Sequence, residues 1–180
     1  FSDRASPVSF GGPFRYRPLP FKLEQLPKID LVVISHSHYD HLDRYTVGEL
    51  NRRKGGTHFL VGLGTSEWFR DEGITAVTEL DWWQQAPASL FPGLQITCLP
   101  VQHWSMRKIG DRNKALWCSW ALKATCGRSV YFTGDSAYCP VFSDIGAQLG
   151  PFDCALIPIG AFKPQQVLRH HHMSPNDAVQ

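Results

Sequence analysis

The residues that could do chemistry gather first in the segment ISHSHYDHLD, residues 34–43, directly behind the apolar run IDLVV. Its ligand-capable side chains are His36, His38, Asp40 and His41. In an extended backbone alternate side chains share one side, so His36, His38 and Asp40 point together, while His41 turns inward as the chain enters the next element. Imidazole and carboxylate are ligands that zinc accepts. The spacing therefore predicts part of a metal site, with two imidazoles for one cation and an Asp plus an imidazole for a second.

Three further candidate ligands each follow another predicted strand. His103 comes after LQITCLPV, Asp135 comes after SVYFTG, and His172 comes after CALIPIG and a loop. Two of them have a plainer interpretation by themselves, His103 as a hydrogen-bonded core histidine and Asp135 as a turn or cap residue. The neighbouring His170 and His171 are expected to be exposed or to lie beside the ligands. A solvated polar loop is the alternative for residues 34–43, but it would leave unpaired imidazoles next to a buried strand.

The strands that must position these residues are predicted from short apolar, β-branched runs bounded by polar and glycine residues. Two of them, in IDLVVIS and FDCALIPIG, are continuously apolar and are expected to be buried. The predicted strands cover residues 29–35, 58–62, about 76–80, 94–101, 117–124, 129–135 and 152–160.

Amphipathic stretches that end at glycine predict helices over residues 43–54, 65–73 and 140–150. In the first of these, Asp43 is the expected N-cap, and Tyr45, Val47 and Leu50 are expected on one apolar face. A last helix is expected near the carboxyl end, with Ser174 as its cap and Asp177 in its first turn. The alternation of strands and helices predicts a mixed α/β domain.

Length and composition limit the class of protein. The chain has 180 residues, 43% of them hydrophobic, and a net charge of +2, which predicts one globular domain over residues 1–180 and argues against a nucleic-acid partner. No run approaches the roughly 18 to 20 apolar residues of a membrane span. The five cysteines occur singly without a CxxC pair, a usage typical of a reducing, intracellular compartment.

Residues 1–28 are rich in proline, glycine and arginine and are predicted to form an extended surface loop that leads into the domain. This loop is both apolar and cationic, which suits a peripheral contact with anionic lipid. A loop packed over the sheet or against a second subunit of a homodimer is the alternative. The residues concerned are Phe10, Phe14, Phe21, Arg4, Arg15 and Arg17.

The histidine-rich segment resembles a known family. The pattern HxHxDH, here HSHYDH, followed by a later His, Asp and His, is the signature of the metallo-β-lactamase superfamily. The finer resemblance is to its N-acylphosphatidylethanolamine-hydrolysing phospholipase D branch, through RASP, LPKIDLVVISHSHYDHLD, ELDWW, QHW, NKALWCSW, GDSAYCPVF, GPFDCALIPIGA and HMSPNDAV in that order. The resemblance covers essentially the whole chain and implies an αββα sandwich with two mixed sheets between helices. It also implies a fragment, because family members carry strands before RASP and more chain after the last helix begins.

The resemblance implies two zinc ions and assigns a ligand to each matching position. One zinc would be bound by His36, His38 and His103, the other by Asp40, His41 and His172, and both by Asp135. The implied reaction is hydrolysis of N-acylphosphatidylethanolamine, a phospholipid met at a membrane surface, to N-acylethanolamine and phosphatidate. A hydroxide held between the cations would attack phosphorus. Asp40, which would orient this hydroxide and accept its proton, and the bridging Asp135 are the expected catalytic residues.

Two other functions are compatible with the same residues. The metal ligands are shared across chemistries, so the chain could be a lactonase, a ribonuclease-like phosphodiesterase or another phospholipase on this scaffold. The absence of a concentrated Lys/Arg stripe argues against a nuclease. A fragment that binds metal without catalysis is the remaining alternative.

Overall fold

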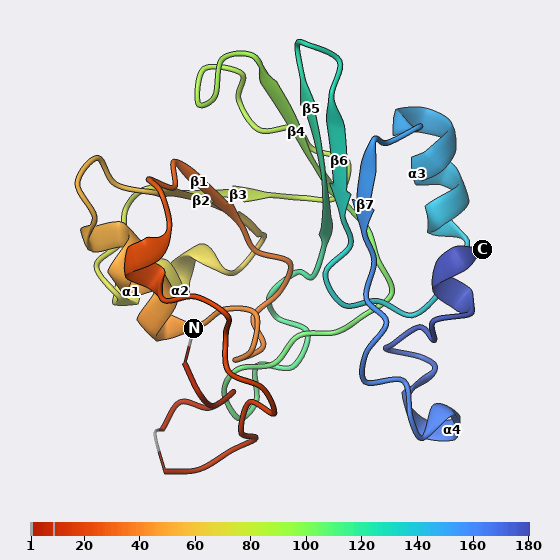
Figure 1. Cartoon of the computed structure of the whole chain (residues 1–180), viewed down its shortest axis with the longest axis horizontal. Helices are drawn as coiled ribbons and strands as arrows, with labels where there is room; N and C mark the ends of the chain where they lie inside the picture. The colour runs from red at the N-terminus through yellow and green to blue at the C-terminus, as the bar shows by residue number, and fades with distance from the viewer. Residues whose placement is uncertain (1, 9) are drawn as a thin grey trace.

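The computed structural model describes residues 2–8 and 10–180, whose strands form two sheets with the orders β1-β2-β3 and β4-β5-β6-β7 (Figure 1). All seven strands expected from the sequence are present, most of them shorter at one or both ends. The strands are β1 (Leu31–Val33), β2 (His58–Gly62), β3 (Val77–Leu80), β4 (Leu94–Leu99), β5 (Ser119–Ala124), β6 (Ser129–Phe132) and β7 (Cys154–Leu156). The helices are α1 (Arg44–Arg52), α2 (Ser66–Asp71), α3 (Val141–Leu149) and α4 (Gln165–Leu168), with 3-10 helices at Leu23–Gln25 and Asp177–Val179.

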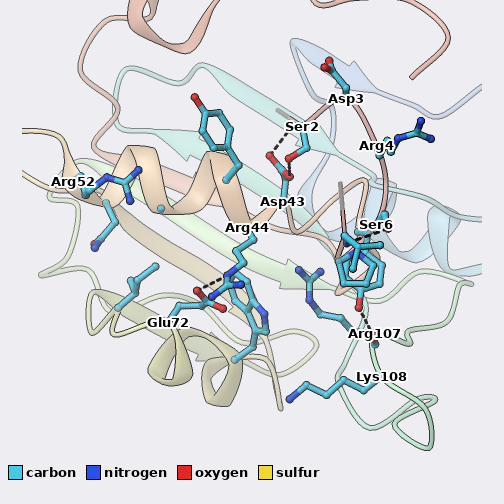
Figure 2. Close-up of a pocket in the computed structure, with 18 of the residues that line it drawn as sticks. Ser2, Asp3, Arg4, Ser6, Asp43, Arg44, Arg52, Glu72, Arg107 and Lys108 are labelled. Carbon is cyan, nitrogen blue, oxygen red and sulfur yellow. Dashed lines mark hydrogen bonds and ion pairs between the residues drawn. The ribbon is translucent and has the colours of Figure 1, made fainter. Parts of the chain in front are cut away.

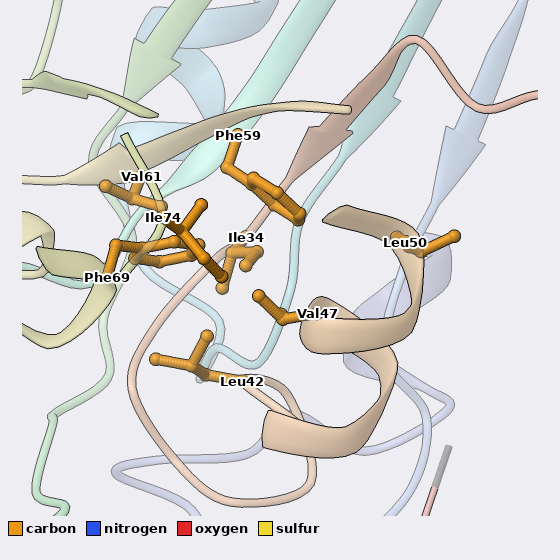
Figure 3. Close-up of a cluster of buried hydrophobic side chains, with 8 residues drawn as sticks. All are labelled: Ile34, Leu42, Val47, Leu50, Phe59, Val61, Phe69 and Ile74. Carbon is orange, nitrogen blue, oxygen red and sulfur yellow. The ribbon is translucent and has the colours of Figure 1, made fainter. Parts of the chain in front are cut away.

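The first sheet is wholly parallel, which corrects the expectation that both sheets are mixed. Parallel neighbours need a crossover connection, and α1 joins β1 to β2 while α2 joins β2 to β3. Both helices cover one face of this sheet, where Val47 and Leu50 of α1 and Phe69 of α2 pack with Phe59 and Val61 of β2 (Figure 3). These apolar contacts fix the helix that follows the histidine-rich segment.

The second sheet is mixed. Strand β5 pairs antiparallel with β4 and β6, whereas β7 pairs parallel with β6 after the crossover through α3. On the outer face of this sheet, Ile145 of α3 packs with Leu99, Ala121 and Tyr131. Helix α3 therefore forms the second outer layer.

A third apolar cluster lies between the two sheets. Leu60 and Leu80 from the first sheet meet Ile96, Cys98 and Trp120 from the second. The order of layers is helix, sheet, sheet, helix, which confirms the expected αββα architecture.

The solvent exposure of Tyr45 and of the residues of β7 differs from the sequence-based expectation. Tyr45 is 52% exposed although Val47 and Leu50 are buried. Residues two positions apart on a helix are separated by roughly 200° around its axis, so Tyr45 faces away from Val47. The residues of β7 are exposed instead of buried, because β7 is an edge strand, and Leu156 lies open to solvent.

The chain after β7 also differs from the prediction. The Ser174 amide and hydroxyl each donate to Asp177 Oδ2 at 2.8 Å. The helix that follows is the 3-10 helix Asp177–Val179, whose N-cap is Asn176, so Ser174 is not the expected helix cap. Helix α4 was not predicted, because its four residues have no apolar period.

Residues 2–28, described except for residue 9, run along the α1 side of the domain (Figure 1). The segment is anchored where the Ser2 hydroxyl donates to Asp43 Oδ1 at 2.6 Å, and an isolated bridge pairs Arg4 with Phe14. Its aromatic side chains remain in solvent, with Phe10 86% and Tyr16 94% exposed. Within the described part of the chain, no helix has the length and apolar character needed to cross a bilayer.

Candidate metal centre

The segment after β1 is a tight polar loop tied to the domain at both ends. Before it, the Ile34 amide donates to Leu60 O at 3.0 Å, which continues the pairing with β2. Within it, the Leu42 amide donates to His38 O at 2.8 Å and turns the chain toward α1. After it, Asp43 caps α1 as predicted by accepting from the Thr46 amide at 3.1 Å. The sheet and the helix thus fix the loop that carries the first four candidate ligands.

His36 is the centre of the cluster and is only 2% exposed. Its ring centroid lies 4.5 Å from that of His38, 4.2 Å from that of His41 and 4.6 Å from that of His103. The potential ligand atoms of His36, His38 and His103 lie within 4.8 Å of one another. Those of His36, His41 and Asp135 form a second group of the same size, so His36 belongs to both groups.

Asp135 lies among histidines from three different segments. Its Oδ2 is 3.1 Å from His41 Nε2, 4.0 Å from His103 Nε2 and 3.9 Å from His172 Nδ1. Asp40 lies at the rim with an exposed side chain, and its Oδ2 is 3.6 Å from His41 Nε2. One carboxylate therefore sits between the histidines, and a second one faces solvent beside them.

The loops that carry the later candidates are joined by backbone hydrogen bonds. The Ala137 amide donates to Gln102 O at 2.9 Å, and the Met173 amide donates to Ser136 O at 2.9 Å. The loops after β4 and β6 and the turn after α4 therefore lie side by side. This pairing brings His172, sixteen residues beyond the end of β7, to the same edge as the others.

Two imidazole orientations are set by neighbouring groups. The Nδ1 of His103 lies 3.0 Å from His171 O, and because a carbonyl only accepts, this nitrogen carries the proton. Its Nε2 is left as the lone-pair nitrogen. The Ser35 hydroxyl lies 3.0 Å from His36 Nδ1 and 3.4 Å from His41 Nδ1, so one hydroxyl contacts two rings.

Burial keeps most of these imidazoles neutral. It lowers the pKa of His103 to about 4, and burial with the neighbouring histidines holds the pKa of His36 well below its usual value. His41 is also buried, but its hydrogen bond and charge contact with Asp135 outweigh burial and raise its pKa. The same contacts lower the pKa of Asp135 against the effect of burial. The cluster therefore presents the neutral imidazoles of His36 and His103 together with the ionised Asp135 carboxylate, which is paired with His41.

This donor set fits a bound cation. Neutral imidazole nitrogens and carboxylate oxygens are what zinc and similar ions coordinate. His38 Nε2 and His103 Nε2 are buried and have no hydrogen-bond partner among the described residues. A buried nitrogen without a partner is costly, and a metal ion would satisfy His103 Nε2. On His38 the nitrogen that faces His36 is Nδ1, which lies 2.8 Å from His36 Nε2.

The structure brings all seven sequence-predicted residues to one edge of the sandwich. Asp40 and His172 lie at the periphery, outside the two compact groups. His170 is exposed, and His171 contributes its carbonyl as a neighbour. Sequence reasoning missed Ser35, whose only signal is a polar residue at the end of an apolar run. It also missed how Trp104, next to His103, places its ring 4.4 Å from that of His38.

A large cavity, shown in Figure 2, is lined by none of the candidate-ligand histidines. It has a volume of about 1160 Å³ and is walled by residues 2–8, α1, α2 and the loop that carries Arg107. Tyr39 and Asp43 line this cavity and also a smaller one of about 370 Å³ that includes Asp40. The rim of the candidate centre thus opens toward the groove under the amino-terminal segment.

Known proteins share this fold and sequence. Residues 5–180 match the sequence profile of the family described as "Beta-lactamase superfamily domain". The chain is similar to N-acyl-phosphatidylethanolamine-hydrolyzing phospholipase D 1 of Caenorhabditis elegans, with 43% identity over 100% of this chain and 52% of that protein. It is also 30% identical to the mitochondrial N-acyl-phosphatidylethanolamine-hydrolyzing phospholipase D of Saccharomyces cerevisiae, over 93% of this chain and 36% of that protein.

Among solved structures, Igni18, a metallo hydrolase from Ignicoccus hospitalis, superposes with a TM-score of 0.66 and 27% identity, over 84% of this chain and 57% of that one. The chain spans about half the length of the first curated relatives that it matches. The resemblance noted from the sequence is confirmed: the chain has the metallo-β-lactamase fold and belongs to the β-lactamase superfamily domain family.

Proposed function

We propose that this chain is the metal-binding part of a zinc-dependent phosphodiester hydrolase of the phospholipase D type. The observation that carries the proposal is the convergence of the His38, His41 and His103 imidazoles and the Asp135 carboxylate on His36. Among the described residues the buried His103 Nε2 has no hydrogen-bond partner. Two zinc ions would be held by His36, His38 and His103 on one side, by Asp40, His41 and His172 on the other, and by Asp135 between them.

Zinc ions bound here would supply Lewis acidity and would lower the pKa of a coordinated water toward neutrality. Two carboxylates of the chain would have different roles beside these zinc ions. Asp135, surrounded by His41, His103 and His172, supplies the negative charge that offsets the cations. Asp40, exposed at the rim, would accept the proton of an attacking water and pass it to the leaving group.

The proposed substrate is N-acylphosphatidylethanolamine, supported by the names of the relatives at 43% and 30% identity. The oxygen of water would bond to phosphorus, and the bond from phosphorus to the ethanolamine oxygen would break. The leaving oxygen would take up a proton, which gives N-acylethanolamine and phosphatidate. No serine or cysteine nucleophile is required, and Cys98 and Cys118 are buried.

Access to a lipid surface is proposed through the amino-terminal segment. Phe10 and Tyr16 lie in solvent, and Arg17 places its guanidinium 5.9 Å from the Tyr16 ring centroid. Exposed aromatic and cationic side chains together favour the interface of anionic bilayers. Phe10→Ser combined with Tyr16→Ser should therefore weaken sedimentation with anionic vesicles. Unchanged vesicle binding by this double variant would contradict the assignment of the surface.

The substrate proposal is tested by comparing turnover of three phosphodiesters by the zinc-loaded protein. These are an N-acylated phosphatidylethanolamine, a plain phosphatidylethanolamine and a generic aryl phosphodiester. We expect the N-acylated lipid to be cleaved fastest, and His38→Ala to remove bound zinc and turnover together. Equal rates on all three compounds would refute the substrate class. Turnover that survives the loss of zinc would refute the metal-dependent mechanism.

A further inference from the structure

Arg107 makes contacts that its place in the sequence does not explain. Its Nη1 donates to Ser37 O at 2.9 Å and to Leu42 O at 2.8 Å, two carbonyls that lie 70 and 65 residues earlier in the chain. Ser37 and Leu42 are buried and flank His38, Asp40 and His41. One guanidinium nitrogen therefore spans the loop that carries three of the candidate ligands.

The guanidinium is held between two aromatic rings. It lies 4.3 Å from the Tyr39 ring centroid and 4.8 Å from that of Trp68 in α2, while the Tyr39 hydroxyl donates back to Arg107 O at 2.6 Å. Figure 2 shows Arg107 in the wall of the large cavity. Within residues 2–8 and 10–180, no carboxylate lies within 4.0 Å of it in an ion pair. The Arg107 guanidinium thus interacts with backbone carbonyls and aromatic rings, for which its planar, cationic shape is suited.

The same segment also carries a candidate ligand. His103 lies four residues before Arg107, and the backbone between them is fixed where the Asn113 amide donates to Ser105 O at 2.8 Å. The Arg107 amide donates to Asp111 Oδ1 at 3.0 Å, which closes the turn on its other side. The backbone of residues 103–107 is therefore fixed by hydrogen bonds and carries both the His103 imidazole and the Arg107 side chain that contacts the loop of residues 37–42.

We propose that Arg107 is a positioning residue, which clamps the loop of residues 37–42 and so sets where His38, Asp40 and His41 lie relative to His103. This inference rests on the proposed metal centre for its functional consequence. The clamp itself is a property of the metal-free chain and is tested separately.

The test compares Arg107→Met with Lys108→Met. Methionine keeps an apolar stem between Tyr39 and Trp68 but removes the donor, while the control removes a neighbouring exposed cation from the same cavity wall. In metal-free protein, hydrogen exchange of peptides that cover residues 34–43 should be faster in Arg107→Met than in the control. Zinc affinity, measured by competition with a chromophoric chelator, should fall about 10-fold or more. The visible spectrum of bound Co²⁺ should change in shape only in Arg107→Met.

Equal exchange rates and equal zinc affinity in the two variants would overturn the proposal. If Arg107→Met does not fold, Arg107→Lys decides, because it keeps the positive charge but carries its donor on a shorter stem that does not reach the Nη1 position bonded to both Ser37 O and Leu42 O. It should show a changed Co²⁺ spectrum and weaker zinc binding, and wild-type values for both would overturn the proposal. If the wild-type protein takes up no zinc, the proposed metal centre fails, and hydrogen exchange of the loop still decides whether Arg107 is a clamp.

Discussion

Gly134, next to Asp135, is the position where one methyl group should do most damage to the candidate centre. Its φ is +66°, and a Cβ placed there would lie 2.3 Å from Ser35 Cβ and 2.7 Å from Ser35 Oγ. Ser35 precedes His36, so the contact joins the two loops that carry these ligands. A methyl group at Gly134 must therefore displace one loop from the other.

The expected magnitude follows from two effects. A left-handed backbone costs an alanine about 1–2 kcal/mol. Overpacking costs about 1–3 kcal/mol more, because the two carbon atoms must separate by roughly 1 Å to reach an ordinary contact. Gly127→Ala is the matched control, since Gly127 has a φ of +90° and open space around its Cβ position. We expect about 2–5 kcal/mol of lost stability for Gly134→Ala and about 1–2 kcal/mol for Gly127→Ala.

Urea denaturation of the two metal-free variants measures the difference directly. Zinc competition with a chelator gives a second measurement, in which Gly134→Ala should bind about 10- to 100-fold more weakly and Gly127→Ala should match the wild type. Equal losses of stability in both variants, with zinc affinity unchanged, would refute the reasoning that Gly134 is required by its contact with Ser35.

Three further predictions concern the core, pH and metal removal. Trp120→Phe should lower stability by about 2–3 kcal/mol in urea denaturation, because it leaves the buried Ile34 carbonyl without the indole donor now at 3.1 Å. Burial lowers the pKa of His58, so the unfolded chain binds more protons and stability should fall as pH drops below about 6.5. His58→Gln should reduce this loss in denaturation curves recorded from pH 7 to 5. Chelation of zinc present at about 100 times its Kd should remove about 2.7 kcal/mol of stability and leave a cooperative unfolding transition by circular dichroism.

Local sequence patterns were sufficient where one residue type or one short period decides the structure. The run HFLVG predicted β2 with its observed bounds, His58–Gly62, because a strand buried on both faces reads as continuously apolar. The candidate ligands were found from residue type and from their positions behind predicted strands. Asp43 was found as a cap because its hydrogen bond to the Thr46 amide is local.

The remaining features depend on contacts between distant segments. Nothing near Leu156 in the sequence shows that β7 is an edge strand, because exposure depends on what packs against it. The contact of Arg107 with Ser37 and Leu42 spans at least 65 residues and leaves no periodic signal. Ser35 likewise contacts the rings of His36 and His41 only because the loop turns after β1.

The backbone places the candidate ligands before any cation is considered. The Cys118 amide donates to Ser35 O at 2.8 Å and fixes the histidine-rich loop against the approach to β5, while Ala137 and Met173 join the other loops by their own amides. Removing a ligand side chain should therefore abolish metal binding and leave these backbone bonds intact. Altering Gly134 or Arg107 should weaken metal binding by a different route, because every ligand remains while the spacing between the loops changes. Loss of a ligand side chain should thus lower metal affinity alone, whereas Gly134→Ala should lower metal affinity and fold stability together.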